Sequence, residues 1–326
     1  MKNNLKLAIL SSVIFSSAGL AGSVAMAQNY VLRLSHTGAP THHYQTITEA
    51  FAAEIAEKTD GAVEVQVFPS DQLGNQLESV EGTMIGTLEL TLASDTVLSN
   101  WVPDMGALNL PFLFNDMNEY LEVVEGPVGD NLSAQLEQQG AIILGWWGNG
   151  MRHVTNNVRP INVPADLDRL KIRVPEGKVF VDTFNALGAG ATVMSFSELY
   201  SALQLGVVDG QENPPAHIIT QNFNEVQKYV SRTGHIHMGS PLIINADLFH
   251  SMPEDIQTIL METGREFDHK HIDMIAALEE RQWKEIADRG MEINDVDKAP
   301  FREAVQPVYD NASATISAEI LDQLVK

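Results

Sequence analysis

The stretch between residues 171 and 215 constrains the fold of this chain more than any other segment. Lys171–Val174 form a short β-like run, which Pro175 stops because proline lacks a ladder donor and restricts the residue before it. Apolar side chains then recur at helical spacing over residues 179–187, and Gly188 follows as a helix C-cap signal. A strand followed at once by a helix predicts an α/β fold.

A second helix is predicted in the same stretch. Ser195 is placed to cap it, with Glu198 three residues later as in a capping box, and Gly206 ends it. The segment that follows closes on Pro214 and Pro215. We expect this segment to be neither regular helix nor central strand, because proline disrupts both.

Strand and helix patterns also alternate in the rest of the chain. Residues 31–34 and 63–67 alternate apolar and polar side chains, and residues 46–57 between them have one apolar helical face. This order implies a right-handed crossover that joins two parallel strands. A long helix is predicted from Ser251, the start of a second capping box, to about Gly290. At about 1.5 Å per residue it would exceed ~50 Å, so we expect it to span two lobes or to bend between them.

The first residues have the features of an export signal. Lys2 and Lys6 precede a run of apolar and small residues over 7–21, and Ala25-Met26-Ala27 fits a signal-peptidase site. We therefore expect a signal peptide that is cleaved after Ala27 and a mature protein in the periplasm. A transmembrane anchor is the alternative, but the run is shorter than the ~20 strongly apolar residues that a span needs.

The composition argues against several classes of function. The formal charge is -23, and it becomes -25 without residues 1–27, which contain two lysines and no carboxylate. Nucleic acid is not an expected partner, because phosphate binding needs clustered Lys and Arg; ordinary solubility explains the charge. The chain has no cysteine, and its His42–His43 and His235–His237 pairs lack further ligands at zinc-site spacing, so we expect no metal and no cofactor. The absence of G-x-S-x-G and H-E-x-x-H motifs argues against an enzyme.

Several further motifs follow one another in order along the chain. They are Q-L-G at 72–74, L-P-F at 110–112, G-x-R-H-x-T-N at 150–156, E-V-Q-K-Y at 225–229 and M-P-E-D at 252–255. Together with K-I-R-V-P at 171–175 and Q-E-N-P at 211–214, they make the chain resemble one family. This family is the solute-binding component of tripartite ATP-independent periplasmic (TRAP) transporters, of the dicarboxylate-binding type. The resemblance covers nearly all of the chain after the N-terminal segment.

The resemblance implies a two-lobed periplasmic binding-protein fold with a ligand cleft between the lobes. One lobe would hold residues 28–149 plus 239–279, and the other would hold residues 150–238 plus 280–326. The protein is then expected to be a monomer that captures a small organic acid and delivers it to the TRAP membrane permease subunits. A periplasmic sensor with the same binding fold is one alternative, and a secreted α/β enzyme is another.

Arg173 leads the candidate ligand-binding residues. It lies at the end of a predicted strand, where α/β proteins often contact ligands, and its planar fork matches a carboxylate with two hydrogen bonds. The resemblance implies that Arg173 pairs with the ligand carboxylate and that Arg152 assists it. It also implies that Asn213 supplies a ligand-binding amide and that Phe196 packs on the ligand. From the residues alone, surface ion pairs for the arginines, a turn role for Asn213 and a core position for Phe196 stay open.

Five more residues are predicted to lie at the cleft. Gln76 and Ser94, with Asp95 beside it, fall where the related proteins vary with their substrate. The resemblance implies acidic residues at these places in a sialic-acid binder, so Gln76 and Ser94 argue against that ligand. His36 follows the first predicted strand, and Trp147 either walls the pocket or packs within a buried strand.

Overall fold

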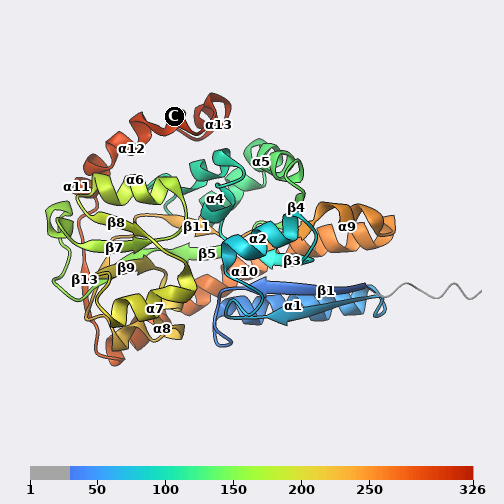
Figure 1. Ribbon diagram of the computed structural model, residues 1–326, viewed down its shortest axis with the longest axis horizontal. Helices are drawn as coiled ribbons and strands as arrows, with labels where there is room; N and C mark the ends of the chain where they lie inside the picture. Colours follow the sequence, from blue (N-terminus) through green and yellow to red (C-terminus); the bar gives the residue numbers. More distant parts are fainter. Residues whose placement is uncertain (1–29, 326) are drawn as a thin grey trace, which may run out of the picture.

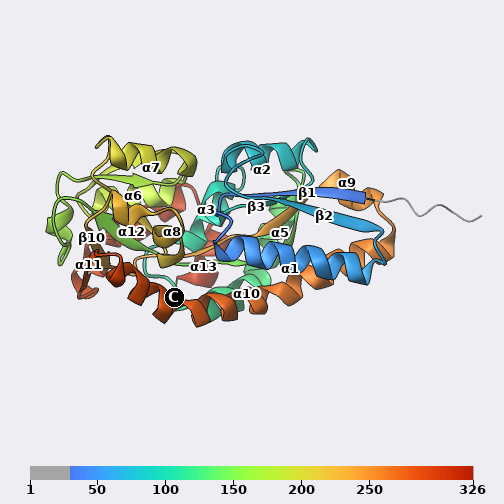
Figure 2. The ribbon, with the colours of Figure 1, turned by 90° about the horizontal axis from the view of Figure 1, so that it is seen from below.

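The computed structural model describes residues 30–325, which form two lobes side by side along the long axis of the molecule (Figures 1 and 2). Each lobe is built on its own β-sheet. A two-stranded ribbon, made of β5 (Gly148–Met151) and β11 (His237–Gly239), lies between the two sheets. The predicted α/β class is confirmed. The predicted signal peptide lies outside the described residues.

The first lobe is organised around a five-stranded sheet in the order β2-β1-β3-β12-β4. Its strands are β1 (Tyr30–His36), β2 (Val63–Phe68), β3 (Leu90–Leu92), β4 (Ala141–Gly145) and β12 (Leu242–Asn245). As predicted, β1 and β2 are parallel, whereas β12 runs antiparallel to β3 and β4. The connecting helix α1 (His43–Lys58) starts three residues before the predicted position, because the His42 ring caps it by accepting the Tyr44 N–H.

The second lobe has a six-stranded sheet in the order β13-β10-β6-β9-β7-β8. Its strands are β6 (His153–Asn156), β7 (Lys171–Val174), β8 (Gly190–Val193), β9 (Gly210–Asn213), β10 (Tyr229–Arg232) and β13 (Glu292–Asp295). Strand β7 forms where it was predicted. The two predicted helices after it are α6 (Lys178–Ala186) and α7 (Phe196–Gln204).

The segment before the two prolines is a central strand, so the prediction that it is not one was wrong. Strand β9 pairs with β6 on one side and with β7 on the other. Each proline limits only its own position: Pro214 follows the last residue of β9, and Pro215 occupies the first turn of α8 (Pro215–Thr220). A proline is tolerated there because the first helical N–H groups have no partner within the helix.

Neither predicted capping box forms. Ser195 is the N-cap of α7, as predicted, but its hydroxyl donates to the Glu198 carboxylate at 2.8 Å instead of satisfying the helix backbone. Ser251 is the last residue of α9 (Ala246–Ser251), where its hydroxyl donates to the Leu248 carbonyl. The long helix begins only after Pro253.

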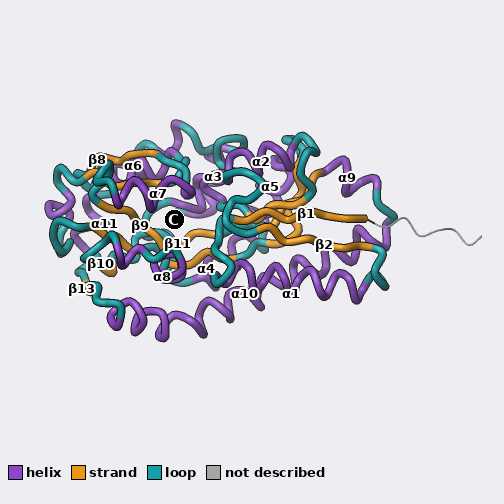
Figure 3. The backbone as a smooth tube through the Cα atoms, turned by 60° about the horizontal axis from the view of Figure 1, so that its bottom comes forward, coloured by secondary structure: helices purple, strands orange, loops and turns teal. Residues whose placement is uncertain are grey.

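Helix α10 (Glu254–Asp288) connects the two lobes, and its 35 residues have the predicted length of about 52 Å. It runs beside α1 in the first lobe and continues below the second lobe (Figures 2 and 3). Phe267 packs in the core of the first lobe against Phe51 and Trp147, with ring centroids 5.7 and 5.9 Å away. Further along, Trp283 belongs to the core of the second lobe. One helix therefore contributes to both cores.

The C-terminal tail returns from the second sheet to the first lobe. It forms α11 (Ala299–Ala304), α12 (Gln306–Asp310) and α13 (Ala318–Leu324), of which α12 and α13 lie along the top of Figure 1. The Ser317 amide and hydroxyl donate to the Asp104 carboxylate at 2.6 and 2.8 Å, which fastens the tail. The lobe boundaries given above stay a prediction.

Short helices complete the fold. They are α2 (Gln76–Met84), α3 (Asp95–Leu98), η1 (Pro103–Asn109), α4 (Met117–Val124), α5 (Pro127–Glu137), η2 (Pro164–Leu167), η3 (Phe223–Glu225) and η4 (Ala312–Ala314). Across residues 30–325, no helix combines the length and the apolar character that a membrane span requires.

Candidate functional site

A small cavity of about 20 Å³ lies between the two lobes, and we call it the interlobe cavity. It is lined by Thr37, Gln76, Ser94, Asn149, Arg152, Arg173, Pro175, Glu176, Phe196, Asn213, His217 and Met238. These side chains come from strand ends and helix starts in both lobes and from the β5–β11 ribbon between them. Six predicted site residues are among them, so the structure brings together residues that are up to 137 positions apart, from Gln76 to Asn213.

Arg173 is a buried cation that has the carboxyl of Glu176 in its surroundings but makes no direct ion pair among the described residues. Its side chain belongs to β7 and is 2% exposed. Its Nε donates to the Met194 carbonyl at 2.9 Å, and the guanidinium carbon lies 5.8 Å from the centroid of the Phe196 ring. Within residues 30–325 it forms no ion pair with a carboxylate. Burial lowers the pKa of Arg173 to about 10, so the group is still charged at pH 7. A buried charge of this kind calls for an anionic partner.

Arg152 lines the same cavity, but its fork is already occupied. Its Nε and Nη2 donate to the two carboxylate oxygens of Glu212 at 2.5 and 2.8 Å, and Nη2 also donates to the Glu212 carbonyl at 2.7 Å. His235 Nε2 lies 3.1 Å from the same carboxylate. Burial alone would raise the pKa of Glu212, but the charge and hydrogen bonds of Arg152 lower it below its usual range. The pair is therefore ionised and neutral overall.

The remaining predicted residues that line the cavity are uncharged. The Gln76 side-chain oxygen accepts from both the amide and the hydroxyl of Ser94, at 3.0 and 2.8 Å. These bonds join the first residue of α2 to the N-cap residue of α3. The Asn213 amide donates to the Gln211 side chain at 2.5 Å, which fixes its orientation. Phe196 opens α7 and presents its ring beside Arg173. These groups offer hydrogen bonds and an apolar face without adding charge.

Three predicted residues do not line the interlobe cavity. Trp147 packs in the core of the first lobe, where its indole N–H donates to the Gly264 carbonyl at 3.1 Å. Asp95 accepts from the Asn109 side chain and the Gly239 amide, and burial raises its pKa to about 7. His36 lies 3.0 Å from the Gln45 side chain, and burial lowers its pKa to about 4. All three groups are turned toward the interior of the fold.

Five polar or sulfur-bearing residues of the cavity were missed. They are Thr37, Asn149, Glu176, His217 and Met238. Glu176 directly follows the K-I-R-V-P motif and His217 follows the two prolines, so a wider window around those motifs would have included both. Asn149 Oδ1 and His217 Nδ1 are buried and have no hydrogen-bond partner among the described residues. Such atoms are costly to leave unsatisfied, so they indicate a missing ligand or water.

Histidines from both lobes pack next to the interlobe cavity. His42 stacks on His217 with ring centroids 4.1 Å apart, and His43 Nδ1 lies 2.6 Å from His271 Nε2. Burial lowers the pKa of all four rings, so they are neutral at pH 7. In the part of the chain that the structure describes, no group of three or more His, Asp or Glu side chains is placed to hold a metal ion.

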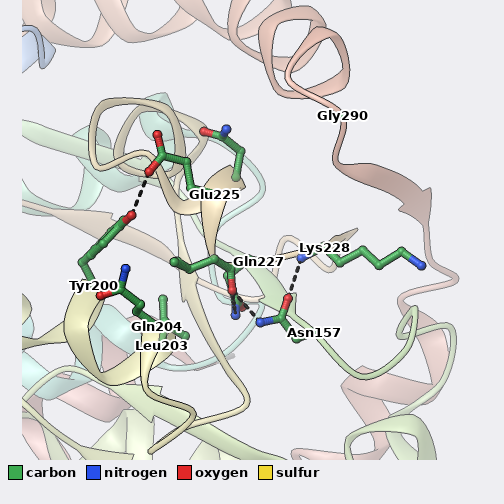
Figure 4. Close-up of a pocket in the computed structure, with 10 residues that line it drawn as sticks. Asn157, Tyr200, Leu203, Gln204, Glu225, Gln227, Lys228 and Gly290 are labelled. Carbon is green, nitrogen blue, oxygen red and sulfur yellow. Dashed lines mark hydrogen bonds between the residues drawn. The ribbon is translucent and has the colours of Figure 1, made fainter.

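A wider hollow of about 590 Å³ lies on the second lobe and contains none of the predicted site residues (Figure 4). Two pairs of its polar groups are hydrogen-bonded to each other. The Tyr200 hydroxyl donates to Glu225 at 2.8 Å, and the Lys228 amide donates to Asn157 at 2.8 Å. The interlobe cavity is the better candidate, because it combines an unpaired buried cation with unsatisfied polar atoms.

Comparisons with known proteins show what the chain is similar to. A family model described as bacterial extracellular solute-binding protein, family 7, matches residues 34–315. The C4-dicarboxylate-binding periplasmic protein DctP of Rhodobacter capsulatus is 34% identical and covers 96% of this chain and 96% of its own length. A TRAP periplasmic solute-binding protein from Polaromonas sp. JS666, solved with D-erythronate, has a TM-score of 0.88, 32% identity and coverage of 91% and 98%. A Roseobacter denitrificans counterpart, solved with L-galactonate, has a TM-score of 0.85, 32% identity and the same coverage.

Proposed function

The chain belongs to family 7 of the bacterial extracellular solute-binding proteins, and we propose from this premise that it captures a hydroxylated monocarboxylic acid between its lobes. Proteins of this family are the substrate-binding components of transporters and not enzymes, which removes the enzyme alternative. The TRAP type of the chain, and with it delivery to a TRAP permease, follows from the same membership.

The observation that supports the proposal most is the unpaired charge of Arg173. Its Nε is used by the Met194 carbonyl, and its two Nη groups have no hydrogen-bond partner within residues 30–325. A carboxylate that accepts from both Nη groups would complete a forked, charge-assisted pair. Phe196 would pack against the same ligand end, since its ring already lies beside the guanidinium. Arg173 is therefore the proposed carboxylate-binding residue.

The charges around the cavity favour one carboxylate over two. Glu212 neutralises Arg152, so Arg173 is left as the single uncompensated arginine among the described lining residues. Glu176 also lines the cavity, where burial raises its pKa and the nearby charge of Arg173 opposes part of that rise, so a second carboxylate from the ligand would compete with Glu176 for the same cation. Burial likewise raises the pKa of the nearby Asp71 to about 7. A second ligand carboxylate would be buried without a cation, which is costly.

The uncharged lining residues favour hydroxyl groups on the rest of the ligand. Gln76, Ser94, Asn149, Asn213 and His217 all line the cavity and are neutral groups that donate or accept hydrogen bonds. Hydroxyls both donate and accept, so they suit such a lining better than a second carboxylate or an alkyl chain. The Polaromonas and Roseobacter relatives were solved with D-erythronate and L-galactonate, which are hydroxylated monocarboxylates. The Rhodobacter relative is instead named for C4-dicarboxylates.

Ligand capture requires the lobes to move. A cavity of about 20 Å³ holds roughly one water molecule, so an acid of four or more carbons enters only when the lobes separate. We propose that the moving units are residues 28–149 plus 239–279 and residues 150–238 plus 280–326. Closure around the acid expels water and strengthens its pairing with Arg173, because charges attract more strongly in a lower dielectric.

The proposed setting is the periplasm. The chain would be exported by a signal peptide over residues 1–27, would be released by cleavage after Ala27, and would work as a monomer. N-terminal sequencing of the mature protein and its mass in solution test these three statements. A mature chain that keeps residues 7–21 would contradict the export proposal.

Calorimetric titration of the mature protein with D-erythronate, L-galactonate and succinate tests the ligand class. We expect at least one of the two hydroxylated acids to bind ~10-fold or more tightly than succinate, a difference of ~1.4 kcal/mol. Succinate is matched to erythronate in carbon number and has a second carboxylate in place of the three hydroxyl groups. Succinate binding as tightly as the better hydroxylated acid would contradict the proposal.

A further inference from the structure

Two histidine rings from opposite lobes stack on each other next to the interlobe cavity. His42 is the N-cap residue of α1 in the first lobe, and His217 belongs to α8, which follows β9 in the second lobe. Their ring centroids are 4.1 Å apart, and the ring planes are inclined by 23°. His217 lines the interlobe cavity, and His42 packs on it from outside that lining. We call this pair the interlobe stack.

The interlobe stack belongs to a row of side-chain contacts that ends at the acid site. The His217 ring lies edge-on to the Phe196 ring at 4.9 Å, and the Phe196 ring lies 5.8 Å from the guanidinium carbon of Arg173. Tyr44 packs edge-on against both histidines, with its ring centroid 4.5 Å from His42 and 5.7 Å from His217. Both histidines are at most 2% exposed. His42 therefore supports, through His217, the ring beside the proposed carboxylate-binding residue.

The backbone of α1 fixes the protonation state of His42. His42 Nδ1 accepts the Tyr44 N–H at 3.1 Å, so the single ring proton of the neutral form is on Nε2. A protonated imidazole carries a hydrogen on both nitrogens and cannot accept a hydrogen bond. Protonation of His42 would therefore break the cap of α1 and displace the ring. The interlobe stack in this geometry requires a neutral His42.

The surroundings of the interlobe stack also disfavour a positive charge. The titratable and charged groups around it are His43 and Tyr44 of α1, His36 of β1, His271 of α10, Arg152 before β6, Arg173 of β7 and Glu212 of β9. Arg152 and His235 already take up both carboxylate oxygens of Glu212. Burial lowers the pKa of both stacked rings well below the usual range, and the neighbouring histidines lower it further. The charges of Arg152 and Arg173 add to this effect at His217, so both rings are neutral at pH 7.

We propose that His42 is a positioning residue for the acid site: while both rings of the interlobe stack are neutral, it holds His217 at the cavity and the lobes together, and a proton on either ring releases this contact. The inference rests on the proposed function, in which the lobes separate to admit the acid. Separation parts the two rings and exposes them to water, where a histidine takes up a proton near pH ~6.5. Proton uptake thus favours the separated lobes, and the acid binds less tightly as the pH falls.

The size of the effect follows from this difference in protonation. A ring that titrates with a pKa of ~6.5 only when the lobes are apart weakens binding ~10-fold between pH ~7.5 and pH ~5.5. Carboxyls near the cavity act in the opposite direction, because burial raises the pKa of Glu176 and raises that of Asp71 to about 7. The contribution of one ring is therefore measured as a difference between two proteins that share these carboxyls.

His42→Asn tests the role of the first ring. Asparagine is a favoured N-cap residue, so the variant keeps the cap of α1 but has neither a ring nor a titrating group. Calorimetry gives the Kd of D-erythronate and of L-galactonate for the mature protein at pH ~7.5 and at pH ~5.5. We expect the ratio of the Kd at the lower pH to the Kd at the higher pH to be ~10-fold smaller in His42→Asn than in the wild-type protein. Equal ratios would overturn the inference, because a residue with only a packing role weakens binding equally at both pH values.

His250→Asn is the matched control. His250 lies in the last turn of α9, but its side chain is 55% exposed, and its Nε2 lies 2.9 Å from the Glu137 carboxylate. The Kd ratio of this control should equal the wild-type ratio. A ratio lowered as far as in His42→Asn would overturn the assignment to His42.

The experiment separates this inference from the proposed function. Binding of either acid at the higher pH concerns the proposed function alone. If neither acid binds, that proposal fails, and small-angle scattering of the ligand-free protein tests the interlobe stack instead. The radius of gyration should then rise as the pH is lowered over the same range, and it should rise less in His42→Asn. An equal change in both proteins would overturn the inference.

Discussion

Replacing Arg173 with lysine tests the carboxylate-binding assignment at a single functional group. Lysine keeps the positive charge but offers a point donor, whereas arginine offers a planar fork. In the structure, Arg173 Nε donates to the Met194 carbonyl, and the rest of the guanidinium group lines the interlobe cavity. An ammonium group has no fixed geometry with which to serve both at once. The variant should therefore bind the acid poorly while keeping its net charge.

The expected loss follows from the number of bonds. The proposed pair has two charge-assisted hydrogen bonds, and each of these contributes about 1.5–3 kcal/mol. Loss of one bond alone corresponds to a ~10- to 100-fold weaker affinity. The thermal unfolding midpoint of the ligand-free protein should change little, because within residues 30–325 Arg173 has no ion pair that the substitution would break.

Calorimetric titration and thermal unfolding of the same preparation measure both quantities. Arg33→Lys is a matched control, because Arg33 also makes a forked pair, with Glu89 at 2.8 Å, but is 41% exposed. Such a surface pair is worth about 0–1 kcal/mol, so this control should bind the acid normally. Wild-type affinity in a folded Arg173→Lys protein would refute the assignment. A lowered unfolding midpoint with normal affinity would show that Arg173 has a structural role.

Three further outcomes are expected. Glu212→Gln should lower the free energy of unfolding by about 3 kcal/mol, because it leaves Arg152 as an uncompensated buried cation. Denaturant titration measures this free energy, and a loss below ~1 kcal/mol would contradict the prediction. The free energy of unfolding should fall as the pH is lowered from about 6.5 towards 4. Burial lowers the pKa of His36 and His237 to about 4, so in this pH window these histidines bind protons only in the unfolded chain. Carboxyls whose pKa is raised, such as Asp95 at about 7, oppose this fall in part, and a stability that rises over the same window would refute the dominance of the histidines. Small-angle scattering should show a smaller radius of gyration with bound acid, and an unchanged value at saturation would count against closure.

Elements with strong local periodicity were predictable from the sequence. Strand β7, helices α1 and α6 and the length of α10 depend on the spacing of apolar side chains within a few turns. The error at β9 has a local cause too, because the rule that excludes proline from strands was extended to the residues before Pro214. The starts of helices were less predictable, since His42 and Pro253 occupy N-cap positions that are usually held by Ser, Thr, Asp or Asn.

The site was predictable only where a motif marked it. Arg173 and Asn213 stand in recognisable motifs and line the interlobe cavity. The pairing of Arg152 with Glu212 joins residues 60 positions apart and depends on the register between β6 and β9, which no local pattern encodes. The same holds for Trp147, whose position on the core side of the sheet follows from packing against α1 and α10.

The continuity of α10 has a mechanical consequence. Between Glu254 and Asp288 the helix contains no proline, and its one glycine, Gly264, is held against the Leu144 carbonyl, where a Cβ atom would lie 2.3 Å away. No built-in break therefore separates the part under one lobe from the part under the other. A change in the angle between the lobes therefore has to bend the helix gradually over several turns, and this bending stores elastic energy. We therefore expect part of the free energy of the proposed ligand capture to be elastic, and we expect exposed positions such as Ala277 to influence affinity through the stiffness of the helix.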